Sequence, residues 1–225
     1  QGLFGPVKRV TTTAELIEQK HLADFQVKAL VLNYSDETKK QMARVSYQDE
    51  IDFIVRNEKR NRFIRNLTLS LTGNTLLLFQ YVEKHGKILH GEISAAAGEK
   101  RKVFFVHGGV DGDAREEIRR IVEIEKDAII VASYGVFSTG VNIKNLSSVI
   151  FASPSKSRIR NLQSIGRGLR RSETKTAATL YDIADDMTWK KKKNYTLLHF
   201  VERIKTYSEE KFPYKIYRLS IEENT

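Results

Sequence analysis

The chain has 225 residues, of which 40% are hydrophobic and 29% charged, so it can bury a core for one large or two small domains and is not a disordered chain. It contains no cysteine, which excludes disulfide bonds and thiolate metal sites and favours a reducing compartment, and its longest apolar runs are far too short to cross a bilayer. The formal charge of +10 makes a polyanion such as nucleic acid the first expected partner.

The N-terminal part reads as loops and a short helix at 13–20, followed by a first strand. Apolar residues alternate with polar ones from Phe25 to Val31, which is a strand pattern. We therefore assign residues 1–37 to an interdomain linker and the first strand, and residues 38–225 to one domain. Apolar residues then recur at spacings of three and four between 47 and 71, with a charged interruption at 57–62. This pattern predicts one long helix or two consecutive helices.

Beyond residue 75, short apolar strands alternate with helical segments. Because the strands are apolar on both faces, we predict an α/β fold with a parallel sheet and helices on both faces. Ligands bind at the carboxyl ends of the strands in such sheets. Asp113 followed by Glu116 is typical of a helix start. The predicted strands are 75–80, 103–106, 128–132, 149–152, 178–183 and a closing edge strand over 214–219; the predicted helices are 81–95, 111–124, 156–175 and one around 197–204.

Positive charge is concentrated in two segments. Residues 156–175 contain seven basic residues and one acidic residue, and Lys190–Lys193 add four lysines, so these segments account for the whole formal charge. The lysine run alone fits a solvated loop better than a specific contact. The longer segment predicts a helix whose arginines suit a triphosphate, because guanidiniums match phosphate oxygens, although a solvated basic helix explains the arginine count about equally well. Four residues fall on one stripe of that helix: the amide Gln163, the glycine Gly166, which has no side chain, and the two arginines Arg167 and Arg170.

Two further loops follow predicted strands. Val106-His107-Gly108-Gly109 frees backbone amides for a phosphate, although a plain turn is the simpler interpretation. His107 has no companions at metal-ligand spacing, so we predict no metal site there. Residues 133–142 interleave hydroxyls with glycines, which suits hydrogen bonds to phosphate or sugar and equally an ordinary helix-capping loop.

Taken together, these segments resemble a known family. Gln163-x-x-Gly166-Arg167-x-x-Arg170, preceded by Ser138-Thr139-Gly140-Val141-Asn142, is similar to motifs VI and V of superfamily 2 helicases. The order and spacing of the segments resemble the second RecA-like domain of that group. More narrowly, residues 132–140 and 210–214 resemble the recombination helicases of phages.

The resemblance implies an ATP-driven motor in recombination and fork repair. The expected substrates are branched or forked DNA, with RNA–DNA hybrids as an alternative. It implies that Arg167 and Arg170 reach the γ-phosphate across a domain interface and that Gln163 senses it. The family often has an acidic residue in place of Asn142 and an arginine in place of Ser164. Nucleotide contacts are implied for Gly140, Asn142 and Gly166, and DNA contacts for His107, Gly108, Ser138, Thr139, Lys156 and Arg158.

The sequence contains only half of the expected ATP site. There is no Gly-x-x-x-x-Gly-Lys-Ser/Thr loop, and no Asp-Glu pair ends an apolar strand. We therefore expect ATP and Mg²⁺ to be held mainly by an N-terminal RecA-like domain outside this sequence, and this fragment to be inactive alone. The expected compartment is the cytoplasm, that of the host if the protein is phage-encoded.

Two other functions fit the residues. A non-catalytic nucleic-acid-binding module would explain the basic segments without a motor. A structural domain whose basic helix docks an acidic protein would explain the charge alone. Attraction to a phosphate backbone requires only positive charge, and it does not explain the regular spacing of the arginines or the glycines between them. The motor is therefore the leading hypothesis.

Overall fold

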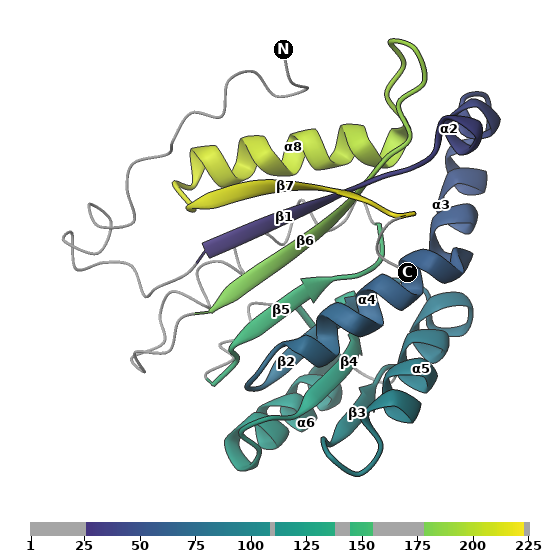
Figure 1. The fold of residues 1–225 in the computed structure, drawn as a ribbon. Helices are drawn as coiled ribbons and strands as arrows, with labels where there is room; N and C mark the ends of the chain where they lie inside the picture. The colour runs from purple at the N-terminus through teal and green to yellow at the C-terminus, as the bar shows by residue number, and fades with distance from the viewer. Residues whose placement is uncertain (1–25, 109–110, 138–144, 155–177, 223–225) are drawn as a thin grey trace.

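In the computed structural model, which describes residues 26–108, 111–137, 145–154 and 178–222, the strands form one parallel sheet. The strand order is β3-β4-β2-β5-β6-β1-β7 (Figure 1). The predicted parallel sheet is thereby confirmed, with β7 at one edge as expected. The strands are β1 (Gln26–Asn33), β2 (Thr75–Phe79), β3 (Val103–Val106), β4 (Ile129–Ser133), β5 (Ser148–Phe151), β6 (Thr179–Asp186) and β7 (Tyr214–Ser220).

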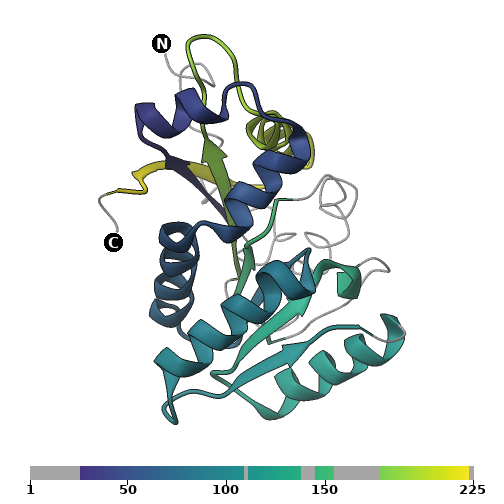
Figure 2. The same cartoon turned by 90° about the vertical axis from the view of Figure 1, so that its right-hand side faces the viewer.

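Helices cover both faces of the sheet, as predicted (Figures 1 and 2). One core cluster joins α6 and α8 to the sheet, and a second joins α3, α4 and α5 to the opposite face. No helix in the described ranges is long and apolar enough to span a membrane. The helices are α2 (Asp36–Met42), α3 (Tyr47–Arg56), α4 (Glu58–Ser70), the π-helix η1 (Val82–Gly86), α5 (Lys87–Ala97), α6 (Asp111–Ile124), the 3₁₀ turn η2 (Tyr134–Phe137) and α8 (Tyr195–Glu209).

The helical segment at 47–71 consists of two helices that meet at Asn57. The backbone of Asn57 is extended (φ −69°, ψ 112°), which ends α3. The Asn57 side-chain oxygen accepts a hydrogen bond from the Arg60 amide at 2.9 Å, which caps the start of α4. Ser46 and Asp49 form a reciprocal capping box at the start of α3. The charged interruption in the sequence is therefore a helix junction.

β1 lies inside the sheet although it comes first in the chain. It pairs in parallel with β6, in the register Gln26↔Thr179, and with β7, in the register Val27↔Tyr214. The first strand is thus part of the same sheet as the rest of the domain.

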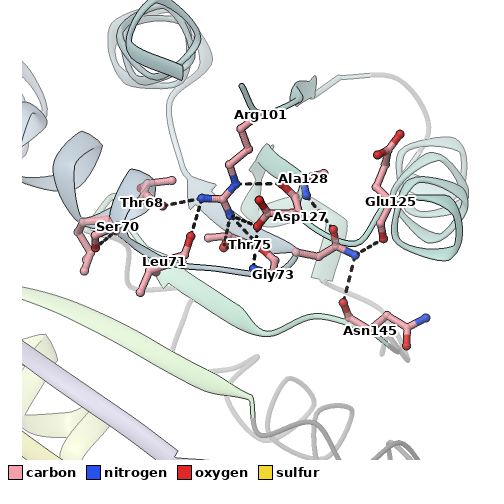
Figure 3. A network of polar contacts seen from close by, with 12 residues as sticks. Thr68, Ser70, Leu71, Gly73, Thr75, Arg101, Glu125, Asp127, Ala128 and Asn145 are labelled. Atoms are coloured by element: carbon pink, nitrogen blue, oxygen red, sulfur yellow. Dashed lines mark hydrogen bonds and ion pairs between the residues drawn. The ribbon is translucent and has the colours of Figure 1, made fainter. Parts of the chain in front are cut away.

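At the amino ends of the strands, a polar network centred on Arg101 ties loops together (Figure 3). The Arg101 side chain is 9% exposed, and burial lowers its pKa while Asp127 opposes that shift. The guanidinium donates to the backbone oxygens of Thr68 (3.4 Å), Leu71 (2.5 Å), Gly73 (2.8 Å) and Asp127 (2.9 Å), and to Thr75 Oγ1 (3.2 Å).

Asn74 extends this network to the start of β5. Its Nδ2 donates to the carbonyls of Glu125 at 2.7 Å and Asn145 at 3.2 Å, and its Oδ1 accepts from the Ala128 amide at 2.9 Å. One buried amide therefore fixes the ends of three segments. The loops at the amino edge of the sheet are thus held together by hydrogen bonds. The candidate site lies at the opposite, carboxyl edge.

Candidate functional site: the carboxyl edge of the sheet

Of the site residues predicted from the sequence, the structure describes His107 and Gly108. The others lie outside the described residues: Ser138, Thr139, Gly140, Asn142, Lys156, Arg158, Gln163, Gly166, Arg167 and Arg170. The flanking described residues fix where these segments begin and end. Residues 155–177 follow Pro154 at the carboxyl edge, just after β5, and precede Ala178 at the amino end of β6.

His107 is exposed and follows β3 directly. Its ring packs on Phe105 with a centroid distance of 4.4 Å, and Phe105 is stacked on His90 at 4.7 Å with an interplanar angle of 12°. Burial lowers the pKa of His90. Gly108 has φ +71°, and a Cβ there would have no atom within 4 Å. The chain therefore turns sharply here and leaves its backbone open to solvent, which suits contact with a phosphate backbone.

A buried ion pair lies beneath the carboxyl ends of β5, β6 and β1. Arg60 of α4 is 0% exposed; its Nε is 2.8 Å from Asp185 Oδ1, and its Nη1 donates to the Ala152 carbonyl at 2.7 Å. The Tyr34 hydroxyl also donates to Asp185 Oδ1, at 2.7 Å. This arrangement joins one helix to the ends of three strands.

Electrostatics favour the charged state of Arg60. Burial lowers the pKa of Arg60, but the charge and hydrogen bond of Asp185, together with Tyr34 and Tyr134, outweigh burial, and the net shift is upward. The pKa of Tyr34 is raised well above its usual value, first by burial and then by Asp185. Tyr34 therefore remains a hydrogen-bond donor.

A second buried network contains His85, whose tautomer follows from its partners. Asn61 Nδ2 donates to the Val55 carbonyl at 3.1 Å, so Asn61 Oδ1 is the acceptor that faces His85 Nε2 at 3.0 Å. His85 Nε2 consequently carries the proton, and Nδ1 accepts from the Ser153 hydroxyl. The Ser153 carbonyl accepts from the Tyr134 hydroxyl at 2.9 Å. Burial, and secondly Arg60, lower the pKa of His85 well below its usual value.

We expect the neutral His85 to make folding stability depend on pH. The unfolded chain binds a proton near pH 6.5, whereas the folded chain does so only at much lower pH, so this contribution is complete above about pH 7 and is lost as pH falls. The expected slope is about 0.7 kcal/mol per pH unit at pH 6.5 and approaches about 1.4 kcal/mol per pH unit below about pH 5.5. Urea unfolding between pH 5 and pH 8 measures it. His85→Gln should remove the His85 contribution and so make the slope shallower, and an unchanged slope in that variant would contradict this account.

Together, the two networks fix Ala152 and Ser153, the residues from which the chain leaves β5 toward 155–177. Sequence reasoning missed both, since Arg60 and Asp185 are 125 residues apart. It also missed α2. Ser35 caps the start of this helix, because its side-chain oxygen accepts a hydrogen bond from the Thr38 amide at 3.3 Å. The Ser35-Asp36-Glu37 sequence was the available signal for that helix.

Three findings relate this chain to known proteins. The family described as helicase conserved C-terminal domain matches residues 58–172. The ATP-dependent DNA helicase uvsW of Enterobacteria phage T4 is 38% identical over 226 residues, which cover 95% of this chain and 44% of that protein. The crystal structure of T4 UvsW matches with a TM-score of 0.74 and 37% identity over 89% of this chain and 42% of that one.

A more distant match shows the fold alone. The SWI2/SNF2 ATPase core domain of Sulfolobus solfataricus has a TM-score of 0.52 and 15% identity, covering 78% of this chain and 42% of that one. The fold is RecA-like, as the motifs implied. The chain spans less than half the length of the phage relative it matches.

Proposed function

Because this chain belongs to the helicase conserved C-terminal domain family, we propose that it is the C-terminal motor domain of an ATP-dependent superfamily 2 DNA helicase that acts on branched or forked DNA. We further propose that an N-terminal RecA-like domain completes its ATP site. The cysteine-free composition supports a cytoplasmic site of action, in the host cell if the protein is phage-encoded.

The observation that carries this proposal is the extent of the family match. It runs from α4 through β2, β3, β4 and β5 and includes the whole arginine stripe from Gln163 to Arg170. The described part of that range places the loops after β3, β4 and β5 at one edge of a parallel sheet, the edge at which such sheets bind ligands. The extent of the family match and this geometry both support the proposal.

In this proposal, Arg167 and Arg170 stabilise negative charge on the transferred phosphoryl group when the two domains close. Gln163 senses the γ-phosphate, and the backbone at Gly140, Asn142 and Gly166 lines the nucleotide. The guanidiniums fit this role because their donors match phosphate oxygens and they stay charged at any working pH. Hydrolysis is thereby coupled to domain movement, because the arginines act only in the closed arrangement.

The nucleic-acid contacts are assigned to the neighbouring loops. The exposed turn at His107 and Gly108 would hold the DNA backbone, together with Ser138, Thr139, Lys156 and Arg158. No group of three or more acidic, histidine or cysteine side chains in the described ranges could hold a metal ion. In this proposal the Mg²⁺ ligands belong to the N-terminal domain.

The test is ATP turnover with and without forked DNA. We expect the 225-residue chain alone to show no turnover, and a longer protein that also contains the phosphate loop and acidic pair to be stimulated by forked DNA more than by linear duplex. Turnover by the chain alone, or a longer protein indifferent to DNA, would contradict the proposal.

A further inference from the structure

A tight hairpin follows β6 at the carboxyl edge. Trp189 and Lys192 form an antiparallel bridge in which each amide donates to the other residue's carbonyl at 3.0 Å. Lys190 and Lys191 make the two-residue turn, and Lys190 has φ 55°, a left-handed conformation that favours glycine. The turn therefore places two exposed ammonium groups at its tip despite a backbone geometry that disfavours a side chain.

The hairpin and α2 form the two walls of an open groove. Lys192 Nζ donates to the Ala43 carbonyl at 2.9 Å, which ties the hairpin to the end of α2 across 149 residues of sequence. The groove has a volume of about 1030 Å³. Its lining consists of Lys40, Ala43, Arg44, Trp189, Lys190, Lys191 and Lys192.

The positive charge of this groove is not neutralised by the described part of the chain. Elsewhere, exposed lysines such as Lys87 and Lys205 pair with a glutamate three or four residues before them in the chain. Within the described ranges, none of the groove's five cations makes an ion pair with a carboxylate. The nearby Glu50 carboxylate is buried and accepts the Tyr195 and Thr196 amides at 3.0 and 2.7 Å, which caps α8. Five uncompensated cations in one groove indicate a polyanionic ligand.

Trp189 indicates which polyanion. It is the sole tryptophan of the chain, and it lies partly exposed in the lining of this groove. A cationic groove with an aromatic side chain in it is the arrangement that holds an unpaired nucleic-acid strand, because the cations follow the backbone while a base stacks on the ring. A duplex, whose bases are already stacked, would use the cations but not the indole.

The groove also lies on the same edge as His107. β6 and β3 are four positions apart in the sheet, which is about 19 Å at normal strand spacing. A strand that crosses the carboxyl ends of the sheet can therefore reach both places. The groove extends the proposed nucleic-acid path toward β1 and β6.

We propose that the groove between α2 and the Trp189–Lys192 hairpin binds an unpaired strand of nucleic acid, with Trp189 as the stacking platform. The inference rests on the proposed function, because it assumes a nucleic-acid substrate, and it adds a contact site for one separated strand.

Two readouts on the 225-residue chain test it: anisotropy of labelled oligo(dT) of about ten nucleotides and the emission of Trp189. We expect the emission to be quenched in parallel with binding. Lys190→Glu with Lys191→Glu should weaken binding about ten- to a hundredfold at low salt and reduce the slope of log affinity against log salt by about 1.4. A matched control, Lys100→Glu with Lys126→Glu, makes the same charge change on exposed lysines at the amino edge and should leave affinity within about twofold.

A third variant separates binding from folding. Lys190→Gly suits the left-handed turn and removes one cation, so it should weaken binding while leaving the unfolding midpoint unchanged. The groove is excluded as the site if both charge-reversal pairs weaken binding equally, or if the chain binds no oligonucleotide at low salt. It is also excluded if the Trp189 emission does not change when the strand binds, or if a duplex of equal length binds and quenches that emission as strongly. DNA-stimulated ATP turnover of the longer protein is measured separately, so failure of the groove leaves the proposed function standing.

Discussion

Arg167→Ala and Arg170→Ala should each lower DNA-stimulated ATP turnover by about 10³-fold or more in a protein that contains both this chain and the N-terminal domain. An arginine supplied across a domain interface stabilises the charge of phosphoryl transfer, and its contribution is about 10³ to 10⁵ in rate. Lysine at either position keeps the charge but loses the planar fork of donors, so it should recover only part of the rate. Single-turnover ATP hydrolysis measures the effect.

Lys175→Ala is the control for these variants. Lys175 belongs to the same basic segment and lies about 80° from Arg167 and about 140° from Arg170 round the predicted helix, off the stripe that is proposed to face the nucleotide. Its removal should leave turnover within about threefold, the change expected of a surface charge. Binding of forked DNA should survive in all three variants. Near-normal turnover in both Arg167→Ala and Arg170→Ala would refute the assigned role.

Arg60→Ala should destabilise the domain by about 3–5 kcal/mol, because it leaves the Asp185 carboxylate buried without its cation. The Ala152 carbonyl, which accepts from Arg60 Nη1, loses its partner as well. Urea unfolding followed by circular dichroism measures the loss.

The neighbouring residue provides the control for Arg60. Lys59 pairs with Glu222 on the surface, where the side chains are 46% and 44% exposed, so Lys59→Ala should change stability by less than about 1 kcal/mol. Arg60→Met with Asp185→Asn removes both charges and keeps an acceptor for the Tyr34 hydroxyl, so it should cost less than Arg60→Ala alone. Equal losses in the double and single variants would mean that the unpaired charge is not the cause.

Local pattern was sufficient to predict most elements. The strand at 103–106 and the helix at 111–124 have the predicted bounds, because apolar runs and a buried stripe of Ile118, Ile121 and Val122 specify them directly. The capping role expected of Asp113 was wrong, because Asp113 lies within the first turn of that helix. α2 was missed because it is short and buries no residue, so it carries no apolar period.

Long-range structure was beyond such reasoning. Arg60 stands in a charged run that resembles a solvated interruption, and only the folded chain brings Asp185 to it. The lysine run after β6 likewise fits a solvated loop until α2 comes to lie beside it. The arginine stripe was predicted through its motif, and the roles of its residues stay predictions, because those residues lie outside the described ranges.

The central place of β1 has a consequence for biosynthesis. As β1 emerges from the ribosome, both of its neighbours are still untranslated, since β6 and β7 end at residues 186 and 220. At normal rates of translation the strand Ala29-Leu30-Val31-Leu32 waits about ten to forty seconds for its partners. These residues are all buried in the finished sheet. Folding of this domain is therefore completed late, and a nascent-chain chaperone is most needed at its first strand.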